Sequence, residues 1–211
     1  MEKPERNTAD LLVECLIEEG VEYIFGIPGE ENLALMNAIY DSSIKFITVR
    51  HEQGAAFIAD VYGRLTGKAG VCLSTLGPGA TNLITGIATA YMDSVPMVAF
   101  TGNVTTEGLG KDGFQEAYIE GITMPITKHN FTVRRVEDLA DTMRAAFRIA
   151  QSGRKGPVLV DIPKDVTAAV CEFTPKKPEP IRTVTTFNEE QVKWAAEIIN
   201  GAQRPLVYFG G

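Results

Sequence analysis

The sequence predicts an α/β fold: a doubly wound, mainly parallel sheet with helices on both faces. Short apolar runs rich in β-branched and aromatic residues alternate along the chain with longer segments of helical period. Strands that alternate with helices of this length are joined by right-handed crossovers and therefore run parallel. With 211 residues, 45% of them hydrophobic, the chain has enough apolar side chains for one sizeable core.

The strands are predicted from the short apolar runs, and the helices from apolar residues spaced three or four positions apart. The predicted strands lie at 23–26, 45–49, 70–75, 97–102, 130–135 and 157–162. The predicted helices run from Thr8 to Glu19, Glu31 to Tyr40, Glu52 to Thr66, Ala80 to Met92 and Val136 to Ser152.

The pattern changes near residue 171, which predicts a domain boundary. Residues 1–170 form the complete domain, and 171–188, with Pro175, Pro178 and Pro180, are interpreted as a linker. Residues 189–211 resemble one helix followed by a strand from Pro205 to Phe209. One helix and one strand bury too little surface for a domain, so we expect them to be the truncated start of a central domain in a longer parent chain.

Composition excludes several classes of function. The net charge of -7 provides no basic surface for nucleic acid. The three cysteines are far apart and the chain has only two histidines, so neither a disulfide framework nor a metal site is predicted. The charged N-terminus lacks the apolar core of a signal peptide, and no apolar run could span a membrane. We therefore expect a cytoplasmic location.

Three glycine-containing corners follow predicted strands, at 26–33, 50–56 and 74–86. Each stands where a strand ends and a helix begins, so all three are expected at the same edge of the sheet, around one cleft. Gly77 and Gly79 allow close approach of a ligand to the backbone. Tight turns of this kind also occur in any doubly wound fold, so the corners alone are weak evidence for a site.

Glu52 is the acid of most interest. It begins a predicted helix, where any acid stabilises the helix dipole. The residues after it, from Gly54 to Phe57, are small or apolar. In such surroundings a carboxyl group loses hydration, which favours its neutral form and suits it to share a proton with a ring nitrogen.

Several motifs together resemble a known family. In order they are "GIPG", "RHEQGAAFIADVYGRLTGKAGV", "STLGPGATNLITGIATAYMDSVPMVAFTG", "GFQEA" and "SGRKGPVLVDIPKDV". They resemble the amino-terminal pyrimidine-binding domain of thiamine diphosphate enzymes, most of all that of the acetolactate (acetohydroxyacid) synthase large subunit. The resemblance covers about residues 8–170.

The resemblance implies a catalytic role for Glu52, the glutamate that hydrogen-bonds the aminopyrimidine ring so that the cofactor can activate itself. It also implies a binding pocket for thiamine diphosphate made by Pro28, Gly29, Thr75, Pro78, Gly79 and Asn82.

Further positions match the family's substrate and flavin contacts. Phe114 and Gln115 match the pair that faces the substrate, and Gln115 counts among the catalytic candidates. Lys164 matches a lysine at the mouth of the substrate channel. Arg154 matches a position that contacts FAD in flavin-containing synthases. A solvated surface charge is an equal alternative for Lys164 and Arg154.

Glu30 departs from the synthase pattern. Synthases usually have Gly or Ala there, whereas "GIPGEENL" is closer to thiamine-dependent 2-keto acid decarboxylases, where an acid at this position helps to protonate the intermediate. Glu30 is therefore also a catalytic candidate. The adjacent His-His pair of those decarboxylases is absent, since the two histidines are His51 and His129.

The expected function is therefore the N-terminal part of an acetolactate synthase-like enzyme. Such an enzyme decarboxylates pyruvate and condenses the hydroxyethyl unit with a second 2-keto acid. The resemblance implies a homodimer or tetramer, Mg²⁺ held by a domain absent from this sequence, and leaves FAD and a regulatory subunit open; the fragment alone should be inactive. The alternatives are a 2-keto acid decarboxylase, a pyruvate oxidase, and a stand-alone nucleotide-binding or regulatory module.

Overall fold

The computed structural model describes residues 6–171, 177–178, 180–181 and 186–209. The chain divides into two units, residues 1–181 and 182–211. The predicted linker lies largely outside the described residues, although Cys171, expected to begin it, belongs to a strand of the first unit.

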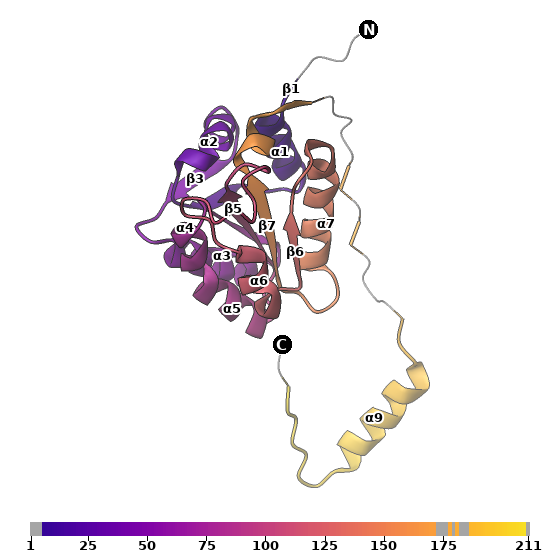
Figure 1. Cartoon of the computed structure of the whole chain (residues 1–211). Helices are drawn as coiled ribbons and strands as arrows, with labels where there is room; N and C mark the ends of the chain where they lie inside the picture. Colours follow the sequence, from indigo (N-terminus) through magenta and orange to yellow (C-terminus); the bar gives the residue numbers. More distant parts are fainter. Residues whose placement is uncertain (1–5, 172–176, 179, 182–185, 210–211) are drawn as a thin grey trace. The chain divides into compact units, whose positions relative to one another are not determined.

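The first unit is built on a six-stranded sheet whose strands all run parallel (Figure 1). The strands are β2 (Tyr23–Gly26), β3 (Lys45–Thr48), β4 (Gly70–Ser74), β5 (Met97–Asn103), β6 (His129–Thr132) and β7 (Pro157–Pro163). Their order in the sheet is β3-β2-β4-β5-β7-β6. The chain therefore switches direction between β2 and β4, which is where ligands bind in open α/β sheets.

Helices cover both faces of this sheet and confirm the predicted fold class (Figure 1). One face carries α1 (Thr8–Glu18), α2 (Leu33–Tyr40) and α7 (Leu139–Gln151). The other face carries α3 (Glu52–Thr66) and α5 (Ile84–Met92). Short helices complete the unit: α4 (Pro78–Asn82), α6 (Ile119–Thr123), α8 (Lys164–Ala168) and the 3-10 turns Glu30–Asn32, Met124–Ile126 and Val136–Asp138.

Local sequence explains where α3 begins and ends. The Nδ1 atom of His51 accepts a hydrogen bond from the backbone N–H of Gln53 at 3.1 Å, which caps the first turn. Gly67 ends the helix in the left-handed conformation, with φ 72°. The predicted helix from Glu52 to Thr66 is therefore confirmed at both ends, and Glu52 stands in its first turn.

The structure corrects several predicted boundaries. The helix predicted from Ala80 to Met92 is two helices, α4 and α5, separated at Leu83. Two further predicted helices begin as 3-10 turns, at 30–32 and 136–138. A two-residue antiparallel ladder between β1 (Arg6–Asn7) and β8 (Val170–Cys171), which the sequence did not predict, ties the two ends of the unit together.

The second unit contains α9 (Glu189–Gly201). The Oδ1 atom of Asn188 accepts hydrogen bonds from the N–H groups of Glu190 and Gln191 and so begins this helix. The prediction of a strand from Pro205 to Phe209 was wrong: these residues are not in a strand and pair with no strand among the described residues. In the described part of the chain, every helix is too short or too polar to cross a membrane.

Candidate functional site

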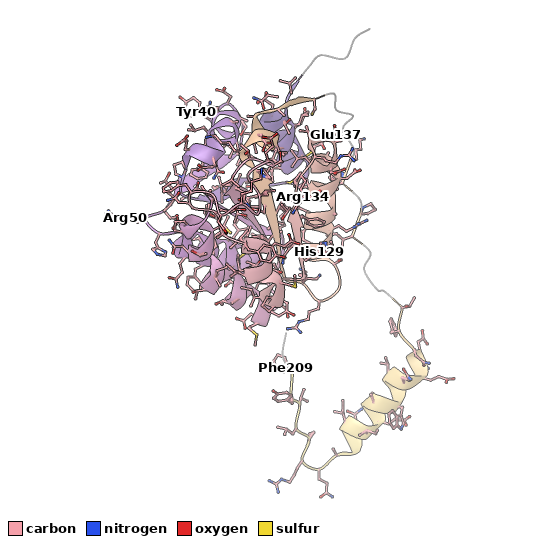
Figure 2. All side chains as sticks on the ribbon, viewed as in Figure 1. Tyr40, Arg50, His129, Arg134, Glu137 and Phe209 are labelled. Carbon is pink, nitrogen blue, oxygen red and sulfur yellow. The ribbon has the colours of Figure 1, made fainter. Side chains whose placement is uncertain are left out.

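The three glycine corners meet at one edge of the sheet. They follow β2, β3 and β4, which are neighbours in the order β3-β2-β4. Because parallel strands place their carboxyl ends together, the corners form one contiguous edge, here called the carboxyl edge. In Figure 2, Arg134 marks this end of β6 and His129 marks the opposite end, here called the amino edge. Arg50, at the corner before α3, points outward.

Glu52 is buried at this edge, with 8% of its surface exposed. Its Oε2 atom accepts a hydrogen bond from Asn82 Nδ2 at 2.9 Å. Among the described residues, Oε1 has no hydrogen-bond partner, and it lies 3.3 Å from the point where a Cβ on Gly79 would stand. One carboxylate oxygen is therefore positioned by Asn82, and the other can accept or share a proton with a ligand.

The corner after β4 brings backbone close to this carboxylate. A Cβ on Gly79 would also stand 2.9 Å from Thr75 Cγ2, so any side chain at this position would force Thr75 to shift. Gly77 has φ 53°, a conformation that favours glycine, and its Cβ would stand 2.0 Å from the carbonyl oxygen of Gln115. The loop that bears Gln115 is thereby packed directly against this corner.

The remaining pocket residues lie around the same corners. Thr75 is half-buried, and its Oγ1 donates a hydrogen bond to Glu31 Oε2 at 2.8 Å. Gly29 approaches Thr75 so closely that its Cβ would stand 2.5 Å from Thr75 Cβ. Pro28 and Pro78 are exposed beside them. The structure thus brings together Gly29, Thr75, Gly79 and Asn82 around Glu52, and Pro28 and Pro78 are the exposed chain neighbours of the two glycines.

The candidate substrate residues lie at the same edge, in two places. Phe114 is 87% exposed on the loop between β5 and α6, and Gln115 beside it has φ 58°. Glu116 holds this loop by accepting hydrogen bonds from the N–H groups of Gly110 and Gly113, which lower the pKa of its carboxyl group. Lys164, after β7, donates to Glu30 Oε1 at 3.0 Å.

Arg154 stands apart from the other candidates. It precedes β7 and therefore lies at the amino edge, on the side of the sheet opposite to Glu52. Its Nε atom donates a hydrogen bond to Ser94 Oγ at 2.8 Å, and its side chain is exposed. The structure does not bring Arg154 to the carboxyl edge, and its contact with FAD stays a prediction.

Sequence reasoning missed a buried polar group further along the carboxyl edge. Asp161 lies at 1% exposure in β7 and accepts hydrogen bonds from Thr101 Oγ1 and Asn103 Nδ2, both at 2.6 Å. Burial raises the pKa of Asp161 to about 6. It lines a cavity of about 260 Å³ beneath the loop that follows β5. An acid inside the apolar run "PVLVDIP" was the signal in the sequence.

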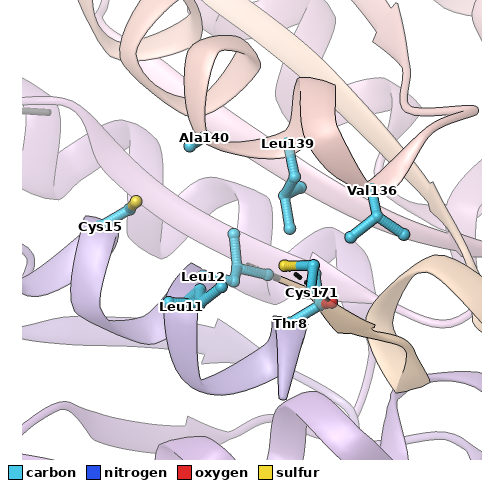
Figure 3. Close-up of a pocket in the computed structure, with 8 residues that line it drawn as sticks. All are labelled: Thr8, Leu11, Leu12, Cys15, Val136, Leu139, Ala140 and Cys171. Carbon is cyan, nitrogen blue, oxygen red and sulfur yellow. Dashed lines mark hydrogen bonds between the residues drawn. The ribbon is translucent and has the colours of Figure 1, made fainter. Parts of the chain in front are cut away.

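Two other features carry no site. In the described part of the chain, no three His, Cys, Asp or Glu side chains are grouped to hold a metal ion. A cavity of about 10 Å³ lies between α1 and α7, where the Thr8 hydroxyl donates to Cys171 Sγ at 3.8 Å (Figure 3). A space of that size holds at most one water molecule.

The residues at the carboxyl edge fit the pyrimidine end of a thiamine cofactor. A ring with an acceptor nitrogen needs a carboxyl group at its edge and close backbone along its face, and Glu52 and the corner at Gly79 provide these. The family model "Thiamine pyrophosphate enzyme, N-terminal TPP binding domain" matches residues 6–122. The chain belongs to this family of thiamine pyrophosphate-binding domains.

The similarity to individual proteins indicates a narrower group of enzymes than the family model does. The chain is 50% identical over 209 residues to "Acetolactate synthase" of Arthrospira platensis, covering 95% of this chain and 36% of that protein. It is 49% identical to "Acetolactate synthase large subunit" of Corynebacterium glutamicum, covering 99% and 34%. It is 47% identical to "Acetolactate synthase isozyme 1 large subunit" of Escherichia coli K12, covering 96% and 36%. The chain thus spans about a third of the length of these relatives.

Proposed function

We propose that this chain is the pyrimidine-binding part of an acetolactate synthase, which decarboxylates pyruvate and joins the two-carbon unit to a second 2-keto acid. The observation that carries the proposal is the buried Glu52 carboxylate, held by Asn82 on one oxygen and facing Gly79 with the other. The choice of substrates rests on the names of the relatives.

The chain's own residues would bind and orient the cofactor. Thiamine diphosphate, when bound, supplies the nucleophilic carbon that attacks a 2-keto acid. Glu52 Oε1 holds or shares a proton at a ring nitrogen, and Asn82 keeps the carboxylate turned toward that nitrogen. With the cofactor bound, the corners at Gly29 and Gly79, with Thr75 between them, would hold its ring and shield the Glu52 carboxylate from water.

Substrate contacts belong to the proposal as well. Phe114 and Gln115 lie on a loop that packs against Gly77, so they can reach the same corner. Lys164 offers a cation for the keto acid's carboxylate, although in the free chain it contacts Glu30 at 3.0 Å. FAD and Mg²⁺ as additional cofactors, a regulatory subunit as a partner and a cytoplasmic location are parts of the proposal that rest on the resemblance alone.

A homodimer or tetramer is part of the proposal and has some physical support. On α3, the helix that begins with Glu52, the apolar side chains of Ile58, Val61 and Leu65 are 40%, 50% and 81% exposed. Their spacing places them on one side of the helix. A second copy covering this side would bury apolar surface next to Glu52. Sedimentation of the full-length gene product tests this: a monomer at micromolar concentration would contradict it.

The test of the function is a product analysis on the full-length gene product. It is incubated with pyruvate, thiamine diphosphate and Mg²⁺, and acetolactate, acetaldehyde and acetyl phosphate are measured. We expect acetolactate to dominate. Dominant acetaldehyde would instead indicate a decarboxylase, and acetyl phosphate a pyruvate oxidase. The Glu30→Gly variant serves as the comparison, since in a decarboxylase it would reduce aldehyde release.

A further inference from the structure

In the 3-10 turn Glu30–Asn32, just before α2, three consecutive side chains each contact a residue at or just beyond the end of another strand. Glu30 Oε1 accepts from Lys164 Nζ after β7, and Asn32 Nδ2 donates to the carbonyl of Ser74 at the end of β4 at 2.9 Å. Asn32 is buried, so this turn is fixed against the sheet. The residue between them, Glu31, is therefore held in one direction.

Glu31 points toward the cofactor corner. Its Oε2 atom accepts a hydrogen bond from Thr75 Oγ1 at 2.8 Å, between residues 44 positions apart, and both side chains are half-buried. A hydrogen bond to a carboxylate is stronger than one between neutral groups. The contact thus fixes both the position and the rotamer of Thr75.

Thr75 in turn separates the two glycine corners. Side-chain atoms of Thr75 lie 2.5 Å from an ideal Cβ on Gly29 and 2.9 Å from one on Gly79. The Gly79 position is also 3.3 Å from Glu52 Oε1. A rotation of Thr75 would push its methyl or hydroxyl group into one of these corners, next to the carboxylate proposed to meet the ring.

We propose that Glu31 is a positioning residue of the cofactor pocket: by holding the Thr75 hydroxyl, it sets the spacing between Gly29 and Gly79 and keeps the space beside Glu52 Oε1 open. This inference rests on the proposed function only for the identity of the ligand, thiamine diphosphate. The competing explanation is that Glu31 stabilises the start of a helix as any acid would. That explanation predicts no coupling between Glu31 and Thr75 in cofactor binding.

The experiment measures the thiamine diphosphate dissociation constant of the full-length gene product by titration calorimetry with Mg²⁺ present. Glu31→Leu removes the acceptor and is expected to weaken binding about tenfold. Glu31→Gln keeps a carbonyl acceptor and should stay within about threefold. Glu107→Leu is the matched control, because Glu107 is an exposed acid at the same edge and the Thr75 hydroxyl donates to Glu31 instead; it should leave binding unchanged.

A double-mutant cycle separates positioning from simple stability. Thr75→Val removes the donor, and combining it with Glu31→Leu should weaken binding little more than either change alone. Additive effects, or Glu31→Leu within twofold of the parent, would overturn the inference. If Glu31→Leu fails to fold, Thr75→Ser and Thr75→Val replace it: binding must be kept in the first and weakened in the second, and any other result overturns the inference.

A failure of the positioning role of Glu31 can be told apart from a failure of the proposed function. A protein that binds thiamine diphosphate with coupled Glu31 and Thr75 but forms no acetolactate would support the positioning role and contradict the proposed reaction. Acetolactate formation with uncoupled Glu31 and Thr75 would contradict only the positioning role. Absence of any thiamine diphosphate binding by the parent would overturn both.

Discussion

The carboxyl edge and the amino edge of the parallel sheet differ in which ends of the helices they carry and in the charges that lie beside those ends. At the carboxyl edge helices begin, and the acids Glu31 and Glu52 stand there beside glycine corners. At the amino edge helices end, and cations contact them. Lys128 Nζ donates to the carbonyls of Ile149, in the last turn of α7, and Ser152, just after it, and Lys155 Nζ donates to the carbonyl of Gly67 after α3. Arg154 is a third cation at this edge, but it donates to the side-chain hydroxyl of Ser94, just after α5, and not to a backbone carbonyl.

The difference between the two edges distinguishes residues expected to act in catalysis from residues that only stabilise the fold. Cations at helix C-termini and acids at helix N-termini each contribute roughly 0.3–1 kcal/mol, so either edge could be explained by dipoles alone. Among the described residues, the carboxyl edge differs in having a buried carboxylate, that of Glu52, with one oxygen left for a ligand. Changes to the residues around Glu52 at the carboxyl edge should therefore affect activity, whereas changes to the cations at the amino edge should affect only stability.

The largest expected effect is that of Glu52→Gln. The amide keeps the shape and the contact with Asn82 but cannot share a proton as the acid does, so acetolactate formation by the full-length gene product should fall by at least about 100-fold. Asp10→Asn is the control, because Asp10 is an exposed acid in the first turn of α1. A Glu52→Gln variant with the parental rate would show that Glu52 is only a helix-start acid.

Two glycines with positive φ allow the two edges to be compared directly. Gly77 (φ 53°) and Gly153 (φ 56°) have similar backbone conformations, but a Cβ on Gly77 would stand 2.0 Å from Gln115 O, whereas one on Gly153 meets open space. Gly153→Ala should cost about 1 kcal/mol of unfolding free energy in urea, and Gly77→Ala at least about 3 kcal/mol. Equal losses would mean that the loop bearing Gln115 is not packed on the corner.

Asp161 predicts a pH dependence at the carboxyl edge. Because burial raises its pKa from 3.8 to about 6 in the folded state, the folded protein binds more protons between these values, and stability is lost as pH rises through about 6. The unfolding free energy of the wild type relative to Asp161→Asn should fall by on the order of 1–3 kcal/mol from about pH 4 to about pH 7. A flat difference would contradict the raised pKa.

The smallest effects are expected at the amino edge. Burial lowers the pKa of Lys128, yet its ammonium group contacts two carbonyls at the end of α7. Lys128→Met should cost about 1 kcal/mol of stability, and Lys155→Met, which loses one carbonyl contact, less. Thermal unfolding measures both. Product formation should not change, and a loss of activity without a loss of stability would show that this edge also carries chemistry.

The sequence by itself predicted the six strands of the main sheet, most of its long helices and the edge at which the candidate site lies. Apolar periodicity set the six parallel strands, and glycine corners between strand and helix placed the candidate site at their carboxyl ends. Glu52 could be singled out because an acid followed by small apolar residues is a local pattern. Such features depend on residues only a few positions apart in the chain, so they can be read directly from the sequence.

Only the tertiary structure decided which distant groups meet. The contact between Glu31 and Thr75, the burial of Asp161 between Thr101 and Asn103, and the contact of Arg154 with Ser94 all depend on how the strands are ordered and aligned in the sheet. Residues 205–209 illustrate the limit of local sequence: this run is apolar and has strand propensity, yet it forms no strand and pairs with no other strand among the described residues. Long-range pairing is fixed when the whole sheet assembles, and no local pattern encodes it.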